Sequence, residues 1–130
     1  MGKTVVLVGH CGADSSYLRL TIKQADPDAA AVSAHSSQEL KQLLDQGAEL
    51  VLFNRQVDYG FNSYEGLDLI REIHASHPKA KLMMVTNYPE VQAAAIAAGA
   101  TPGFGKRELG SQRVKDLMKA VLGTPTAVSS

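Results

Sequence analysis

The sequence predicts an α/β fold: a single, doubly wound, open sheet of five parallel strands with five helices on its two faces. Short apolar runs alternate five times with longer segments whose apolar residues recur at helical spacing. Most of these longer segments also have residues at their ends that favour the start or stop of a helix. The 130 residues suit one domain, which we expect at 1–123, followed by a disordered tail at 124–130.

The strands are expected where the sequence is apolar, because a parallel strand covered by helices on both faces has no polar side. The first run, KTVVLVG, is rich in Val, and a later one reads KLMMVT. The last, GFGK, is minimal. The expected strands cover residues 3–9, 29–34, 49–53, 81–86 and 103–106.

The helices are expected between and after these strands, most of them with terminal signals of their own. Asp14 and the two serines after it are expected to cap the first helix. Ser36 and Glu39 match a capping box before the second helix, and Gly47 matches its stop. The expected helices cover residues 17–24, 36–47, 65–76, 89–99 and 113–122.

Composition excludes several classes of function. Thirteen basic and thirteen acidic residues leave no net charge, and Lys and Arg form no cluster, so we expect no binding to nucleic acid. A single Cys excludes an internal disulfide. No apolar segment approaches the length of a membrane helix or follows a basic leader, which predicts a cytoplasmic protein that does not bind membranes.

Polar and small residues follow the expected strands at the point where each strand ends. Gly9, His10 and Cys11 follow the first strand, Asn54 and Arg55 the third, Thr86 and Asn87 the fourth, and Lys106 the fifth. In an open parallel sheet the carboxyl ends of the strands meet at one edge, where ligands usually bind. We therefore expect the candidate site at this edge, with Gly9, His10, Asn54, Thr86 and Lys106 as its main residues.

At these positions the chain resembles the receiver domain of bacterial response regulators, the CheY-like family, over about residues 3–122. The resemblance is carried by AELVLFN before the third loop, by LMMVTN, and by AAGATPGFGK, which ends at Lys106. It implies the strand order 2-1-3-4-5. In that family an Asp after the third strand accepts a phosphoryl group, an acidic pair after the first strand holds Mg²⁺, and a Thr and a Lys grip the phosphate.

The chain retains the Thr and the Lys that grip the phosphate, at Thr86 and Lys106. It departs from the family at the residues that accept the phosphoryl group and hold the metal. Asn54 stands at the acceptor position, and an amide cannot form an acyl phosphate. Gly9 and His10 stand at the acidic pair and do not offer the oxygen ligands that Mg²⁺ needs. The resemblance is thus to a degenerate receiver, or pseudo-receiver, and we expect no enzymatic activity, no metal and no cofactor.

Two further departures affect the expected pocket. Gly103 occupies the place of the aromatic residue that the family uses as a switch. Loss of the acidic cluster is expected to leave Lys106 without its counter-charge and the pocket neutral or mildly positive, so that a small anion could settle there.

The loop after the third expected strand leaves alternatives open. Tyr59, Phe61 and Tyr64 form either a patch for a partner or a cover over the vacant site. Asp58 is either a displaced acceptor or a solvated carboxylate. Cys11 beside His10 is expected to be a buried or half-buried thiol rather than a nucleophile, and the scattered histidines do not predict a zinc site.

These observations predict a phosphorylation-independent interaction module of bacterial two-component signalling. Its partner is expected to be another signalling protein or an attached output domain. The alanine-rich helix at 89–99 would be a thin docking face, similar to the one that receivers use on their fourth and fifth helices. The alternative is a flavodoxin-like domain that binds a small anion or cofactor in the crevice at the strand ends.

Overall fold

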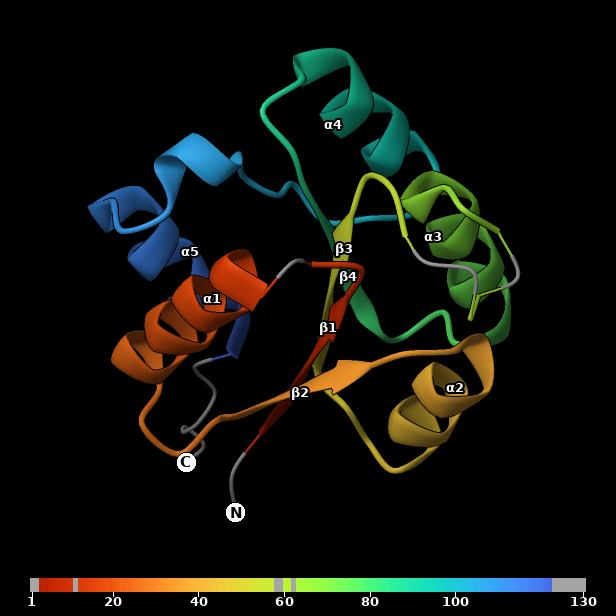
Figure 1. The fold of residues 1–130 in the computed structure, drawn as a ribbon, viewed down its shortest axis with the longest axis horizontal. Coiled ribbons are helices and arrows are strands. Elements are labelled where there is room, and N and C mark those ends of the chain that lie inside the picture. The colour runs from red at the N-terminus through yellow and green to blue at the C-terminus, as the bar shows by residue number, and fades with distance from the viewer. Residues whose placement is uncertain (1–2, 11, 58–59, 62, 123–130) are drawn as a thin grey trace.

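Four parallel strands form one sheet in the order β2-β1-β3-β4 in the computed structural model, which describes residues 3–10, 12–57, 60–61 and 63–122 (Figure 1). The strands are β1 (Thr4–Val8), β2 (Ala30–Ala34), β3 (Leu50–Asn54) and β4 (Lys81–Val85). The helices are α1 (Gly12–Ala25), α2 (Ser37–Asp45), α3 (Gly66–Ser76), α4 (Pro89–Ala97) and α5 (Gln112–Leu122), with a 3-10 turn, η1 (Lys106–Glu108), before α5. The predicted α/β fold is confirmed.

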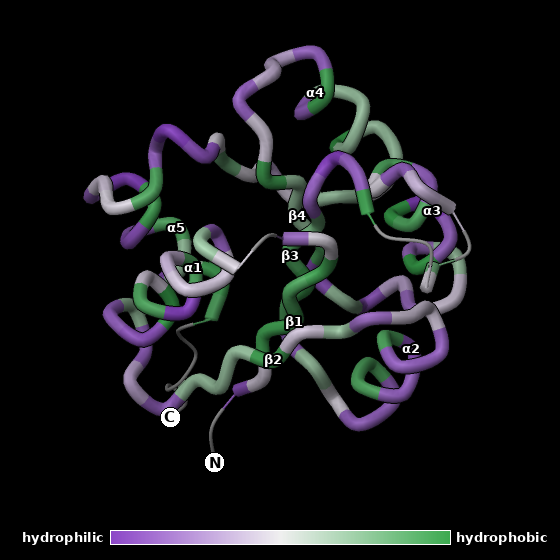
Figure 2. Tube along the Cα trace, in the orientation of Figure 1, coloured by the Kyte–Doolittle hydropathy of each residue, from purple (hydrophilic) through white to green (hydrophobic). Residues whose placement is uncertain are grey.

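Helices cover both faces of the sheet, and each face has its own apolar core. Successive residues of a strand point to opposite faces, so alternate residues of β1, β3 and β4 enter the two cores. On one face the strands pack against α1 and α5, and on the other against α2, α3 and α4, as Figure 1 shows. The strands in the middle of the molecule are accordingly its most continuously hydrophobic segments (Figure 2).

The predicted fifth strand at 103–106 is only an isolated bridge, in which Phe104 pairs with Val85. The prediction of a full strand was therefore wrong, although the fold is unchanged. The Thr86 N–H still donates to the Phe104 carbonyl at 3.0 Å, so the segment lies where a fifth strand would lie. A side chain makes further hydrogen bonds to this segment and to β4.

That side chain is Gln92 of α4. Its Nε2 donates to the carbonyl oxygens of Met84, at 2.8 Å, and Phe104, at 3.1 Å. Its Oε1 accepts from the Gly103 N–H at 3.3 Å. A Cβ on Gly103 would lie 2.3 Å from the Met84 carbonyl oxygen, so the close approach requires glycine and leaves no room for the aromatic residue found in receivers.

Helix starts follow the predicted signals with small shifts. The first helix begins at Gly12, so Asp14 lies in its first turn rather than before it. Ser36 caps α2 as predicted, its Oγ accepting from the Glu39 N–H at 3.1 Å. The Glu39 carboxylate accepts from the His35 N–H at 2.6 Å, one residue before the partner expected in a capping box.

Arg19 of α1 reaches over the outer edge of β2. Its guanidinium donates to the Ala31 carbonyl oxygen and, at 2.9 Å, to Oγ of Ser33. One side chain therefore engages both main-chain and side-chain groups of this edge strand.

Some predictions fall on residues that the structure does not describe: Cys11, Asp58, Tyr59 and the tail at 124–130. In the part of the chain that is described, no helix combines the length and apolar character needed to cross a membrane.

We predict that replacing Gln92 by Leu lowers the free energy of unfolding by about 1–3 kcal/mol, because partly buried main-chain groups lose their partners. Urea denaturation measures the change. Gln38→Leu, at an exposed position of α2, is the control and should change stability by less than about 0.5 kcal/mol. Equal effects of the two substitutions would show that the hydrogen bonds of the Gln92 amide do not stabilise the fold.

Candidate functional site

The carboxyl ends of the strands meet at one edge of the sheet, as predicted, and enclose a hollow of about 260 Å³. We call this hollow the crevice. Its lining includes Asn54, Arg55, Thr86, Asn87, Tyr88 and Lys106. Three predicted site residues, Asn54, Thr86 and Lys106, thus face one space although they are far apart in the sequence.

Asn54 ends β3 and is partly buried. Its side-chain Nδ2 donates to the Gln56 carbonyl oxygen at 2.8 Å, which holds the amide against its own loop. An amide in this position donates and accepts hydrogen bonds but provides no carboxylate oxygen.

Lys106 lies at the start of η1 and has a counter-charge, contrary to the prediction. Its Nζ is 3.2 Å from Oδ2 of Asp14, and both side chains are partly exposed. The prediction failed because Asp14 was interpreted as a cap before α1. Asp14 instead lies in the first helical turn, from which its carboxylate reaches Lys106.

Thr86, directly after β4, is buried, and its Oγ1 accepts from the Tyr88 N–H at 3.3 Å. The hydroxyl therefore helps to shape the turn into α4, while its proton stays available as a donor to the crevice. Asn87 shapes the neighbouring turn, since its Oδ1 accepts from the Arg107 N–H at 3.0 Å.

Arg55 and Tyr88 add a feature that was not predicted. The Arg55 guanidinium lies over the Tyr88 ring, 5.5 Å from its centroid, a cation–π contact across the ends of β3 and β4. Arg55 was expected at the end of the third strand, whereas Tyr88, two residues after Thr86, was not among the residues expected there. Their contact itself leaves no sequence signal.

Gly9 and His10 line a second, smaller cavity, of about 80 Å³, together with Ser15 and Phe61. Gly9 has φ +81°, a left-handed conformation that favours glycine. A Cβ at this position would lie 2.6 Å from Cγ1 of Val57. The loop after β3 therefore fills the space that an acidic side chain would need.

His10 is bonded to the sheet itself. Its Nε2 donates to the Leu52 carbonyl oxygen at 2.8 Å, which assigns the proton of the neutral ring to this nitrogen. Its Nδ1 is buried and finds no hydrogen-bond partner among the described residues. The imidazole thus occupies, as a packed side chain, a position where a receiver has a carboxylate.

Burial lowers the pKa of His10 below its ordinary value. The hydrogen bond to the Leu52 carbonyl opposes this shift, the Lys106 ammonium adds to it, and the Asp14 carboxylate opposes it. Burial dominates because the charged ring would lose its hydration. His10 is therefore neutral near pH 7.

The loop from β3 to α3 folds back over the molecule. Val57 N–H donates to the Tyr64 carbonyl oxygen at 2.9 Å, and the Ser37 N–H donates to that of Gly60 at 3.1 Å. Phe61 is buried in the core with α2 and α3, whereas Tyr64 is 65% exposed. The burial of Phe61 supports the interpretation of this loop as a cover. The exposed Tyr64 remains available to a partner.

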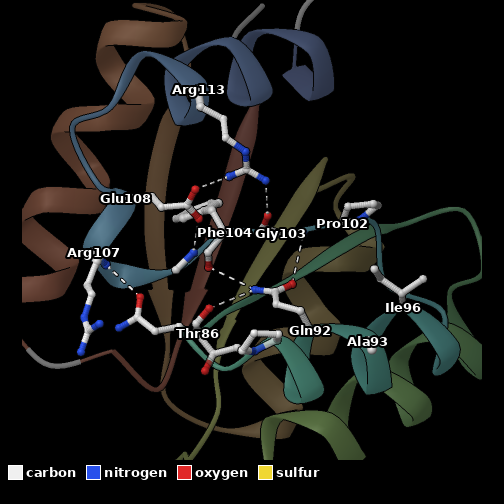
Figure 3. Close-up of a pocket in the computed structure, with 13 residues that line it drawn as sticks. Thr86, Gln92, Ala93, Ile96, Pro102, Gly103, Phe104, Arg107, Glu108 and Arg113 are labelled. Carbon is white, nitrogen blue, oxygen red and sulfur yellow. Dashed lines mark hydrogen bonds and ion pairs between the residues drawn. The ribbon is translucent and has the colours of Figure 1, made fainter.

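A third hollow, of about 600 Å³, runs between α4 and the segment before α5, and we call it the α4 groove (Figure 3). Pro89, Ala93 and Ile96 of α4 form one wall, with Ile96 45% exposed. Gly103 lies on the floor, without a side chain. The far rim is polar: Arg113 donates to the Glu108 carboxylate at 2.8 Å, and this carboxylate accepts from the Gly105 N–H at 2.8 Å.

Within the described ranges, no three His, Cys, Asp or Glu side chains gather as a metal site would require. In the part of the chain that the structure describes, the carboxylate of Asp14 is the one that pairs with Lys106. That the chain binds no metal stays a prediction.

No protein-family model matches the chain, and comparison with curated proteins gives no match. Solved structures do match. The receiver domain of NtrX from Brucella abortus is 21% identical, with a TM-score of 0.68 over 95% of this chain and 100% of that one. A CheY-like protein (tadZ) from Pseudomonas aeruginosa PAO1 is 18% identical, with a TM-score of 0.71 over 98% of this chain and 99% of that one.

The non-phosphorylated receiver domain of the stress response regulator RcsB from Escherichia coli is 16% identical to the chain. Its TM-score is 0.72, over 92% of this chain and 93% of that one. At these identities the likeness shows the fold: the chain has the fold of response-regulator receiver domains.

We predict that the folded chain loses stability as the pH falls from 7.5 to 5. The unfolded chain takes up a proton at His10 near its ordinary pKa of about 6.5, whereas the folded chain resists protonation. The stabilising contribution is therefore present above that value and is lost as the pH falls toward the folded-state pKa. Urea denaturation of wild type and His10→Gln, which keeps a donor for the Leu52 carbonyl, measures the effect.

His10→Gln should weaken this pH dependence, while His74→Gln, at an exposed position of α3, removes a different imidazole as a control. A pH dependence that is unchanged in His10→Gln would contradict the assignment.

Proposed function

We propose that the chain is a receiver-fold interaction module that acts without phosphorylation in bacterial two-component signalling. It binds another signalling protein or an attached output domain in the cytoplasm and catalyses no reaction. The observation that carries this proposal is the state of the strand ends: Asn54 at the acceptor position, Gly9 and His10 at the acidic positions.

The surrounding packing supports this proposal. An acid at Gly9 would collide with Val57, and His10 is bonded to the Leu52 carbonyl. Lys106, which would hold a phosphoryl group, pairs with Asp14 instead. At Gly9, His10 and Lys106, a steric barrier or an existing bond thus stands where phosphorylation would need a free polar group.

The α4 groove is the surface that we assign to the partner. It combines an exposed apolar wall with a polar rim, as the core and edge of a protein interface do. Ile96 is the large apolar side chain on this wall, and the absence of a side chain at Gly103 deepens the floor opposite it. An apolar side chain of a partner would fit between them.

Incubation with acetyl phosphate and Mg²⁺ is expected to leave both the wild-type chain and Asn54→Asp unmodified. The single substitution supplies a nucleophilic oxygen, but a bridging metal ion contributes several kcal/mol to phosphoryl transfer and would lack carboxylates at Gly9 and His10. Intact-mass spectrometry measures the result, with a receiver that retains its acceptor Asp as positive control. A phosphoryl group on the wild-type chain, for example at Asp58, would overturn phosphorylation independence.

Ile96→Glu is expected to abolish binding of the physiological partner by placing a charge against the apolar contact. Leu20→Glu is the matched control, since Leu20 is a similarly exposed aliphatic residue on α1. Cross-linking in cells followed by quantification of the partner compares the two variants. Loss of the partner from Leu20→Glu, with retention by Ile96→Glu, would place the interface on α1.

A further inference from the structure

The lining of the crevice is positively charged, and the interaction proposed above gives this charge no role. Among the described residues, Arg55 and Lys106 are the cationic side chains that line it, and none of the described lining residues is a carboxylate. Asp14 approaches Lys106 from α1. Within the described residues Arg55 makes no ion pair, and its guanidinium is oriented by the Tyr88 ring alone.

Hydrogen-bond donors add to these charges. The Thr86 hydroxyl accepts from the Tyr88 N–H, which leaves its proton free to point into the crevice. The Asn87 amide uses its oxygen to accept from the Arg107 N–H, so its NH₂ group is free to donate. A planar guanidinium, an ammonium and two such donors around one space form a complementary setting for an oxyanion.

We propose that the crevice receives the carboxylate of an acidic side chain on the partner protein, bound between Arg55 and Lys106. This inference rests on the proposed function and names the partner's chemistry at a second contact, next to the α4 groove. Thr86 and Asn87 line both hollows, so one partner segment can fill the groove and place its acidic residue in the crevice.

A partner side chain fits this site better than a free anion does. Lys106 and Asp14 are partly exposed, so the field at the crevice is screened by solvent and holds a dissolved ion weakly. An acidic residue on a protein segment is delivered at high effective concentration by the contacts beside it. Tyr88, which is 53% exposed at the rim, offers an apolar and aromatic surface for such contacts.

Fluorescence anisotropy with a labelled peptide of alternating Glu and Leu tests the proposal, with the peptide carrying Gln for each Glu as its control. We expect the Glu peptide to bind the full chain and its affinity to fall at least about fivefold in Arg55→Gln and in Lys106→Gln. Lys119→Gln, an exposed site on α5 with the same change in charge, should bind as the wild type does. Asp14→Asn should bind more tightly because Lys106 loses its competing carboxylate.

Other outcomes would overturn the proposal. Equal losses in Lys119→Gln and Arg55→Gln would mean a general charge effect, and equal binding of the Gln peptide would mean an apolar contact without a carboxylate. Binding of inorganic phosphate, lost in Arg55→Gln, with no binding of the Glu peptide would assign the crevice to a free anion. Arg55 lies outside the Asp14–Lys106 pair, so its variant tests the site even where Lys106→Gln fails to fold.

This test is independent of the acetyl phosphate experiment. Phosphorylation of the wild-type chain would overturn the proposed function. Peptide binding would still test the crevice contact separately. Absence of peptide binding with an unmodified chain would overturn the crevice contact alone.

Discussion

The whole arrangement depends on the burial of a parallel sheet on both faces. Parallel strands run in one direction and must be covered by helices on each side, so they carry apolar residues along their full length. Polar side chains can therefore enter only where the strands end, and all the strands end at the same edge. This constraint brings Asn54 and Thr86, which are 32 positions apart in the sequence, to one hollow.

The same constraint explains what could be predicted. Apolar runs and helix-end signals determine the elements, and the elements determine which residues meet at the edge, where Asn54, Thr86 and Lys106 line one hollow. Contacts made by side chains of other elements were not predictable. Asp14 reaches Lys106 only because α1 begins two residues before it, and the Arg55–Tyr88 contact depends on two turn geometries.

The prediction of a fifth strand was wrong for a related reason. GFGK has the apolar and small residues of a short strand, but a strand also needs main-chain partners, and the sequence does not reveal that Gln92 supplies some of them from α4. The loop after β3 was likewise open to two interpretations because Phe61 and Tyr64 have similar chemistry and opposite burial. Only packing distinguishes an aromatic residue that covers a core from one that meets solvent.

The contact of Arg19, on α1, with β2 affects how the chain behaves at high concentration. An open sheet ends in strands with unpaired main-chain groups, which can join the strands of neighbouring molecules and lead to aggregation. Here the guanidinium of Arg19 occupies one edge, and the 103–105 segment with Gln92 covers the opposite one. Both edges of the sheet are therefore partly covered, which disfavours edge-to-edge pairing with the sheets of other molecules and leaves contacts between molecules to side-chain surfaces.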